Sequence, residues 1–313
     1  MSIALINRAI LIALGTSQRL RRSSCLIPSY RSVSFSNHCY PIMPTDTVKT
    51  PAYRLLKPLV DNQDATKCDA GSFDVTKVVS ELSDAARAAE AAENNLEDFV
   101  YDTWAEFFKI VAQIEYSSAA QDELVKVLRE LRGTSVTGSG GKTLVVNEAG
   151  EIWKDLPTFG WMARDLWNFD IRDPDNKPED INKFNNQTAF LARLTSLAYS
   201  KGDTNSPLDY SLYALWSFRD AFEQSSQSLA AAKNSAIWIN YASNALKGLA
   251  SKGHDFPDRS GTAGPEYSSK EWKGFNQERW EVWRRGFQNA IQQVGAEADQ
   301  DTRGLLKKAV DLM

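Results

Sequence analysis

The sequence predicts an all-α protein, a multi-helix array of about nine helices. From residue 72 onward, apolar residues recur at spacings of three and four, which is the period of a helix that buries one face. Residue types that start helices stand where each of these apolar runs begins. Segments rich in Gly, Ser and Pro interrupt the series at two places.

The predicted helices follow one another along most of the chain. Four of their starts have the capping-box spacing, in which a side chain satisfies a free main-chain amide of the first turn. These pairs are Asn95 with Asp98, Ser118 with Gln121, Ser206 with Asp209, and Ser268 with Glu271. The helices are expected at residues 74–93, 96–115, 119–132, 157–168, 178–200, 207–224, 227–251, 269–293 and 298–311.

The interruptions divide the chain. Residues 133–143 are rich in Gly, Ser and Thr and predict a flexible linker, after which 144–153 has the pattern of a short hairpin. Residues 252–267 predict a Gly/Asp/Pro loop. We therefore expect an N-terminal helical part with its linker at 43–143 and an aromatic-rich helical domain at 144–313.

Residues 1–42 differ in composition from the rest of the chain. No acidic residue precedes Asp46, and the segment combines a short apolar run with many serines and five arginines, as is typical of a mitochondrial import leader. The alternative is that translation begins at Met43 and that 1–42 is not part of the protein. The expected location is mitochondrial if Met1 is the true start and cytoplasmic if Met43 is; a secretory signal fits less well because of the arginines.

The charge balance argues against several classes of partner. Without the five leader arginines, 31 of the 36 basic residues remain against 40 acidic ones, a net charge of −9. Such an acidic body is not expected to bind nucleic acid or an anionic membrane surface. No apolar stretch approaches the roughly 18 residues of a membrane span. Two His and three Cys exclude a multi-His metal centre and a dense disulfide scaffold.

Motifs that suggest a cofactor or a catalytic site are incomplete. The Gly-rich segment that ends at Lys142 and Thr143 has the last residues of a phosphate-binding loop, but Val136 stands where that loop needs a Gly. The acidic residues between 170 and 180 do not have the ligand spacing of a calcium loop. His254 is a lone loop histidine. We therefore expect no metal and no cofactor, and we lean against an enzyme.

An aromatic residue is followed three residues later by an arginine on three predicted helices. Side chains at this spacing are neighbours on a helix, so the guanidinium can lie over the ring. The pairs are Trp161 with Arg164, Phe190 with Arg193, and Trp216 with Arg219. Arg219 falls inside the apolar face of its helix and Arg193 at the edge of another. A charge in such a place must be paired or must line a cavity.

Two interpretations of these arginines follow. In the first, they form buried interhelical ion pairs that fix helix register, with Asp165 as the expected partner of Arg219. In the second, Arg193 or Arg219 orients an anionic group in a cavity. The walls of this cavity would be Trp161, Trp167, Trp216 and Trp238. The last aromatic helix, with Trp280 and Trp283, has the single apolar face of a core helix.

Five segments resemble a fungal-specific family known only as a domain of unknown function (3632). They cover residues 152–157, 189–194, 214–221, 235–239 and 280–283. Members show Trp-x-Asn-x-Asn ahead of an Ala-Phe pair; here these positions hold Phe184, Asn186 and Thr188, so only the first Asn is retained. The resemblance implies an all-α protein and no activity, and it supports Arg193 and Arg219 as features of the shared fold.

We expect a non-enzymatic helical protein that binds a protein partner or acts as a scaffold. The alternative is an enzyme or carrier that binds a small anionic or aromatic ligand in a cavity lined by Trp and Arg. Its candidate ligand-binding residues are Trp161, Arg164, Asn186, Phe190, Arg193, Trp216, Arg219 and Trp238. A pocket of roughly 300 Å³ or more that reaches Arg193 or Arg219 would favour this alternative.

Overall fold

A computed structural model describes residues 50–63, 73–92, 95–200, 206–294 and 300–313. Residues 50–313 form one compact unit, and the boundary expected at residue 143 lies inside it. The predicted leader lies outside the described residues.

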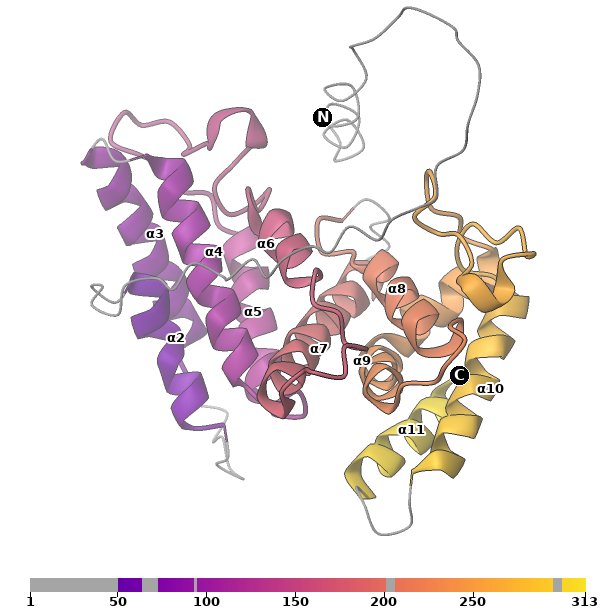
Figure 1. The fold of residues 1–313 in the computed structure, drawn as a ribbon. Coiled ribbons are helices and arrows are strands. Elements are labelled where there is room, and N and C mark those ends of the chain that lie inside the picture. Colours follow the sequence, from indigo (N-terminus) through magenta and orange to yellow (C-terminus); the bar gives the residue numbers. More distant parts are fainter. Residues whose placement is uncertain (1–49, 64–72, 93–94, 201–205, 295–299) are drawn as a thin grey trace, which may run out of the picture. The chain divides into compact units, whose positions relative to one another are not determined.

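The all-α prediction is confirmed: the described residues form ten α-helices and only isolated β-bridges. Four helices lie side by side at the N-terminal end of the unit (Figure 1). They are α2 (Pro51–Asp61), α3 (Val75–Ala91), α4 (Leu96–Gln113) and α5 (Ala120–Arg132). Helix α2 was not predicted from the sequence. It begins after Thr50, whose hydroxyl accepts a hydrogen bond from the Tyr53 amide at 3.2 Å.

The other six helices complete the unit. They are α6 (Phe159–Leu166), α7 (Pro178–Ser200), α8 (Ser211–Phe222), α9 (Leu229–Lys252), α10 (Gln277–Gln293) and α11 (Gln300–Leu312). Helix α7 packs against α4 and α5 on one side and against α9 on the other, and α9 also contacts α8, α10 and α11. One hydrophobic core therefore runs through all these helices, with α7 and α9 at its centre.

Helix α10 begins later than predicted, and the expected capping box at Ser268 and Glu271 is wrong. Asn276 caps the helix instead, because its side-chain oxygen accepts a hydrogen bond from the Arg279 amide at 2.8 Å. The preceding residues pair with the loop after α9, where the amide of Phe275 donates to the carbonyl of His254 at 2.8 Å. This pairing keeps the residues before Asn276 out of the helix.

The Gly/Ser-rich segment after α5 is held against α3. The hydroxyl and amide of Ser139 donate hydrogen bonds to the carboxylate of Glu90. Val136 and Leu144 are buried in the core, and a β-bridge joins Val145 to Glu151 in the expected hairpin region. The segment thus packs as part of the unit.

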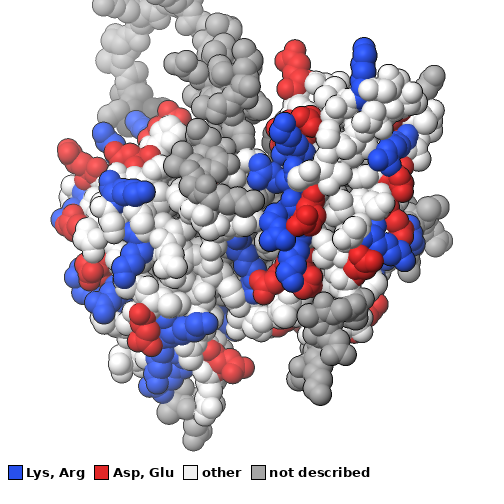
Figure 2. Space-filling model, turned by 180° about the vertical axis from the view of Figure 1, so that it is seen from behind, with Lys and Arg blue, Asp and Glu red and all other residues white. Residues whose placement is uncertain are grey.

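No helix in the described ranges is both long and apolar enough to cross a bilayer. On the rear face, Lys and Arg side chains alternate with Asp and Glu, and the largest group of basic side chains lies right of centre (Figure 2). Because acids accompany the bases, that face presents mixed charge.

Candidate functional site

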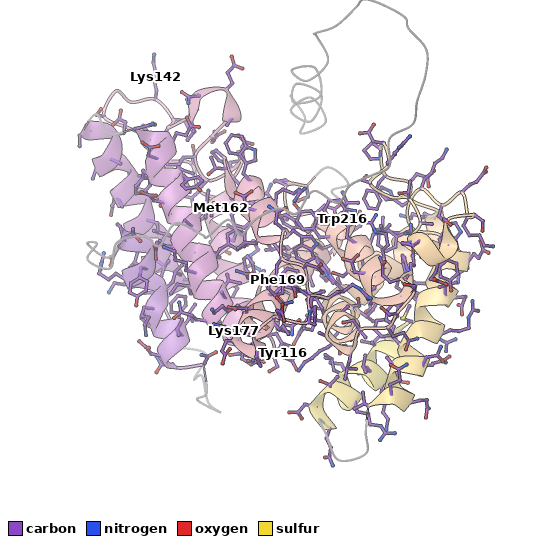
Figure 3. The ribbon with its side chains drawn as sticks, viewed as in Figure 1. Tyr116, Lys142, Met162, Phe169, Lys177 and Trp216 are labelled. Atoms are coloured by element: carbon purple, nitrogen blue, oxygen red, sulfur yellow. The ribbon has the colours of Figure 1, made fainter. Side chains whose placement is uncertain are left out.

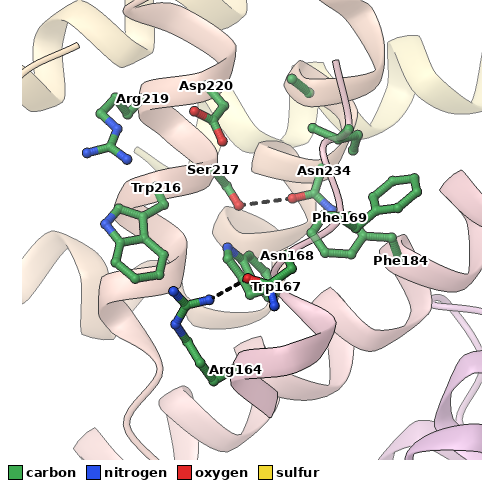
Figure 4. Close-up of a pocket in the computed structure, with 12 residues that line it drawn as sticks. Arg164, Trp167, Asn168, Phe169, Phe184, Trp216, Ser217, Arg219, Asp220 and Asn234 are labelled. Carbon is green, nitrogen blue, oxygen red and sulfur yellow. Dashed lines mark hydrogen bonds between the residues drawn. The ribbon is translucent and has the colours of Figure 1, made fainter. Parts of the chain in front are cut away.

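A cleft of about 300 Å³ opens between α8, α9, the first turns of α7 and the chain that follows α6. Phe169 lies in the middle of the fold, and Trp216 projects from α8 (Figure 3). The lining residues are Arg164, Trp167, Asn168, Phe169, Ile171, Phe184, Trp216, Ser217, Arg219, Asp220, Ala231 and Asn234 (Figure 4).

Trp167 and Trp216 of the cleft wall stack on a third aromatic ring, that of Tyr213. The Tyr213 ring lies between Trp167 and Trp216, with centroid distances of 4.9 Å and 5.3 Å and interplanar angles of 23° and 20°. The indole nitrogen of Trp216 donates to the carbonyl of Ser260 at 2.9 Å, which fixes its orientation. Trp238 meets Trp167 edge-on at 5.9 Å. The wall is therefore held in place before any ligand binds.

The floor of the cleft is a buried polar network. The hydroxyl of Ser217 donates to the side-chain oxygen of Asn234 at 3.0 Å and accepts from the indole nitrogen of Trp238 at 3.1 Å. The amide nitrogen of Asn234 donates to Asn185 at 3.0 Å and to Thr188 at 2.8 Å. The side chains of Ser217, Asn234, Thr188 and Trp238 all have a partner in this network, which holds the floor in place.

Three charged side chains line the cleft. Arg164 donates to the side-chain oxygen of Asn168 at 2.8 Å, and its guanidinium lies 5.7 Å from the Trp216 ring centroid. Arg219 and Asp220 follow each other on α8, and both are half-buried. Within the described ranges, neither side chain makes a hydrogen bond or an ion pair. The cleft thus presents a cation and a carboxyl group that form no ion pair with the described residues.

The surroundings of Asp220 raise the pKa of its carboxyl group. Burial raises the pKa of the Asp220 carboxyl to about 6, although the positive charge of Arg219 opposes this change. Asp170 and Glu223 raise the pKa further by repulsion, and Arg172 lowers it. The carboxyl group therefore changes charge close to neutral pH.

The structure brings together only part of the predicted ligand site. Arg164, Trp216 and Arg219 line the cleft, and Trp238 lies behind its floor. Trp161 is 56% exposed on α6 and is not among the lining residues.

The other three candidates belong to the packing of α7 against α4 and α5. Arg193 is 8% exposed, pairs with Asp122 at 2.9 Å and lies 3.6 Å from the Tyr241 ring centroid. Asn186 donates to the carbonyl of Ala112 at 2.9 Å. Phe190 is fully buried against Phe107. These contacts give the three side chains roles in joining helices.

The expected ion pair between Arg219 and Asp165 is wrong. Asp165 is exposed on α6, and no carboxylate of the described residues lies within ion-pair distance of Arg219. The helical spacing placed Arg219 on an apolar face, but that face opens onto the cleft at this end of α8.

A different arginine, Arg279, which was not predicted as a site residue, forms the fully buried ion pair. Arg279 and Glu223 are both fully buried, and two guanidinium nitrogens donate to the two carboxylate oxygens at 2.7 Å and 3.0 Å. The Gly264 amide and the Trp283 indole also donate to Glu223, at 2.6 Å and 2.8 Å. The sequence contains one indication that Arg279 is buried. Arg279 precedes Trp283 by four residues and therefore lies on the same apolar face of the helix.

A second hollow, of about 350 Å³, lies beside the end of α5, but its basic side chains have partners. Arg129 pairs with Glu130 at 2.8 Å and Lys154 with Glu151 at 2.9 Å. Arg132 donates to the carbonyl of Lys154 at 3.2 Å. The cleft beside α8 is therefore the stronger candidate.

The acidic loop before α7 is organised by its own main chain. The carboxylates of Asp170 and Asp173 accept hydrogen bonds from the amides of Arg172 and Asp175, both at 2.9 Å. No group of His, Cys, Asp and Glu that could hold a metal is found in the described part of the chain.

A family described as "Protein of unknown function (DUF3632)" matches residues 104–287, which is more than half of the chain. The match spans α7, α8 and α9 and so contains all the residues that line the cleft. No curated protein and no solved structure matches the chain.

Proposed function

Because the chain belongs to the DUF3632 family, whose description names no activity, we propose a function from the cleft itself. The protein binds a small ligand that has an acidic group and a flat or aromatic part. The sequence alone favours a protein-interaction role, and the observation that changes this preference is a cleft of about 300 Å³ that contains Arg219.

The positive charges support an anionic ligand. In the view of Figure 4, the Trp216 indole lies between the guanidinium groups of Arg164 and Arg219. A guanidinium offers several fixed donors that match a carboxylate, and Arg219 has no competing carboxylate partner among the described residues. An acid bound here would supply the missing counter-charge.

The walls support a flat ligand of modest size. Trp167 and Trp216 present aromatic surface, and Ser217 and Asn234 present fixed polar atoms beside it. Ligand pockets typically measure about 300–1,000 Å³, so this cleft fits a small metabolite. The two partners of the Ser217 hydroxyl, Asn234 and Trp238, are not bases that could activate it, which favours binding over catalysis.

Calorimetry with a defined acid tests the proposal. We expect 3-phenylpropanoate to bind the full chain and to bind Arg219→Gln about tenfold more weakly, because a charge-assisted contact is lost. The matched control is Arg285→Gln, which removes an exposed arginine of α10 and should leave binding unchanged. Equal affinity of both variants for the acid, or no binding by the unaltered protein, would contradict the proposal.

A protein-interaction role is the second proposal, and the exposure of Trp161 supports it. A Trp that is 56% exposed offers a large apolar contact for a partner. If this role holds, a stoichiometric complex isolated from the native host should dissociate in Trp161→Ala and persist in Tyr101→Ala, which alters another exposed aromatic residue. A complex that survives both changes would exclude Trp161 as its contact.

We also propose that residues 1–42 direct import into mitochondria. The support is compositional: five arginines and no acidic residue before Asp46. Mass spectrometry of the mature protein should find an N-terminus beyond residue 31. An intact Met1, or a cytosolic product that begins at Met43, would contradict the proposal.

A further inference from the structure

We propose that the ligand of the cleft beside α8 is a zwitterion of the α-amino-acid type with a flat side chain. Arg219 binds its carboxylate, Asp220 binds its ammonium group, and the side chain lies on Trp216. This inference rests on the proposed function of the same cleft and adds the second charge of the ligand.

The unpartnered carboxyl group of Asp220 is the first argument. Arg172 does not pair with it, because its guanidinium donates to the main-chain carbonyl of Asp220 at 2.7 Å. Its other nitrogen donates to the carbonyl and hydroxyl of Ser226, both at 2.8 Å. A half-buried carboxylate that has no donor from the described part of the fold can accept hydrogen bonds from a ligand that carries a donor.

The contrast with neighbouring polar groups is the second argument. Glu223, three residues further along the chain, is fully buried and accepts four hydrogen bonds. Ser217 and Asn234 in the cleft floor are also satisfied. The fold therefore satisfies Glu223, Ser217 and Asn234 and leaves the carboxyl group of Asp220 facing the cleft.

The charge balance is the third argument. Arg219 and Asp220 are consecutive on α8 and line the same cleft without pairing with each other. A ligand with only an acidic group would satisfy Arg219 and bring a second negative charge close to Asp220. A zwitterion offers a counter-charge to both residues, and these two ion pairs offset the cost of removing its charged groups from water.

Three probes that differ in one charged group test the proposal by calorimetry at about pH 7.5. L-phenylalanine carries both charges, 3-phenylpropanoate lacks the ammonium group, and 2-phenylethylamine lacks the carboxylate. We expect phenylalanine to bind at least about tenfold more tightly than either of the other probes. Asp220→Asn should bind phenylalanine and phenylpropanoate equally, whereas the exposed-site control Asp311→Asn should keep the preference.

A measurement on the unaltered protein gives an independent test. The groups that act on the Asp220 carboxyl are Arg219, Asp170, Arg172 and Glu223. Since its pKa is about 6, protonation at about pH 5 should weaken phenylalanine binding about tenfold and should not weaken phenylpropanoate binding.

The outcomes separate the two proposals. If phenylpropanoate binds as tightly as phenylalanine, the zwitterion proposal is overturned and the binding of an acid stands. If neither acid binds, or if their binding does not respond to Arg219→Gln, both proposals are overturned. A phenylalanine preference that persists in Asp220→Asn also overturns the role of Asp220.

Discussion

Two sets of oppositely charged side chains lie at the same end of α8. Glu223 and Arg279 form an ion pair, whereas Arg219 and Asp220 do not. Glu223 and Arg279 are fully buried, and the guanidinium also donates to the carbonyls of Gly261 and Gly274, at 2.7 Å and 3.0 Å. Arg219 and Asp220 are half-buried and make no such bonds with the described residues. The comparison teaches that a charge beside an apolar face can join helices and loops or can remain available to a ligand.

Removing Arg279 should have the largest effect. Arg279→Met leaves the buried carboxylate of Glu223 without its counter-charge and should lower the free energy of unfolding by about 3–5 kcal/mol. Replacing Glu223 with Leu in the same chain should recover part of this loss, because the stranded charge is then absent. Urea denaturation measures both effects. A loss below about 1 kcal/mol in the single variant would show that the pair does not stabilise the fold.

Arg193 should give an intermediate effect and mark the boundary of the ligand site. Arg193→Gln removes the ion pair with Asp122, which is 61% exposed, and the contact with Tyr241. We expect a loss of about 1–2 kcal/mol in the free energy of unfolding, with unchanged affinity for 3-phenylpropanoate. Weaker binding at unchanged stability would instead place Arg193 in the ligand site.

Replacing Asp220 should raise the free energy of unfolding at neutral pH, whereas replacing Arg279 or Arg193 should lower it. Its folded-state pKa of about 6 lies above the usual 3.8, so the native state binds more protons and the protein loses stability as pH rises from about 4 to about 6. Asp220→Asn avoids this loss. It should raise the free energy of unfolding at about pH 7.5 by about 1–2 kcal/mol. The whole change in pKa corresponds to roughly 3 kcal/mol, but the side chain is partly exposed and solvent screens part of this energy.

Denaturation of Asp220→Asn at two pH values checks this sign. Near pH 3.5 the carboxyl group is protonated in the folded state and mostly protonated in the unfolded state, so the substitution should change the stability by less than about 0.5 kcal/mol. The control Asp311→Asn alters an exposed residue and should have little effect at either pH. A lower stability of Asp220→Asn at neutral pH would show that the carboxylate has a partner in the fold.

Arg219 should give the smallest change in stability. Since it has no carboxylate partner in the described residues, Arg219→Gln should alter the free energy of unfolding by less than about 0.5 kcal/mol while it weakens the binding of acids. Arg279→Gln should lower the free energy of unfolding far more. If Arg219→Gln lowered the free energy of unfolding about as much as Arg279→Gln, the distinction between the two arginines would be wrong.

Helix content and most helix positions followed from local pattern, because the spacing of apolar residues and the first-turn residues act within one helix. Helix α7 spans Pro178–Ser200, as predicted, with Pro178, Glu179 and Asp180 in its first turn. The start of α10 was predicted too early, because main-chain pairing with a distant loop competes with the helix before Asn276.

The sequence by itself determined an all-α chain, its family and a set of arginines on apolar helix faces. Only the tertiary structure decided which arginine is buried and which lines a cleft. Helical spacing reports the direction of a side chain and says nothing of what packs opposite it. Arg279 meets the carbonyls of the loop after α9 and the carboxylate of Glu223, whereas Arg219 meets the open space beside Trp216. That difference arises from contacts between residues far apart in the chain.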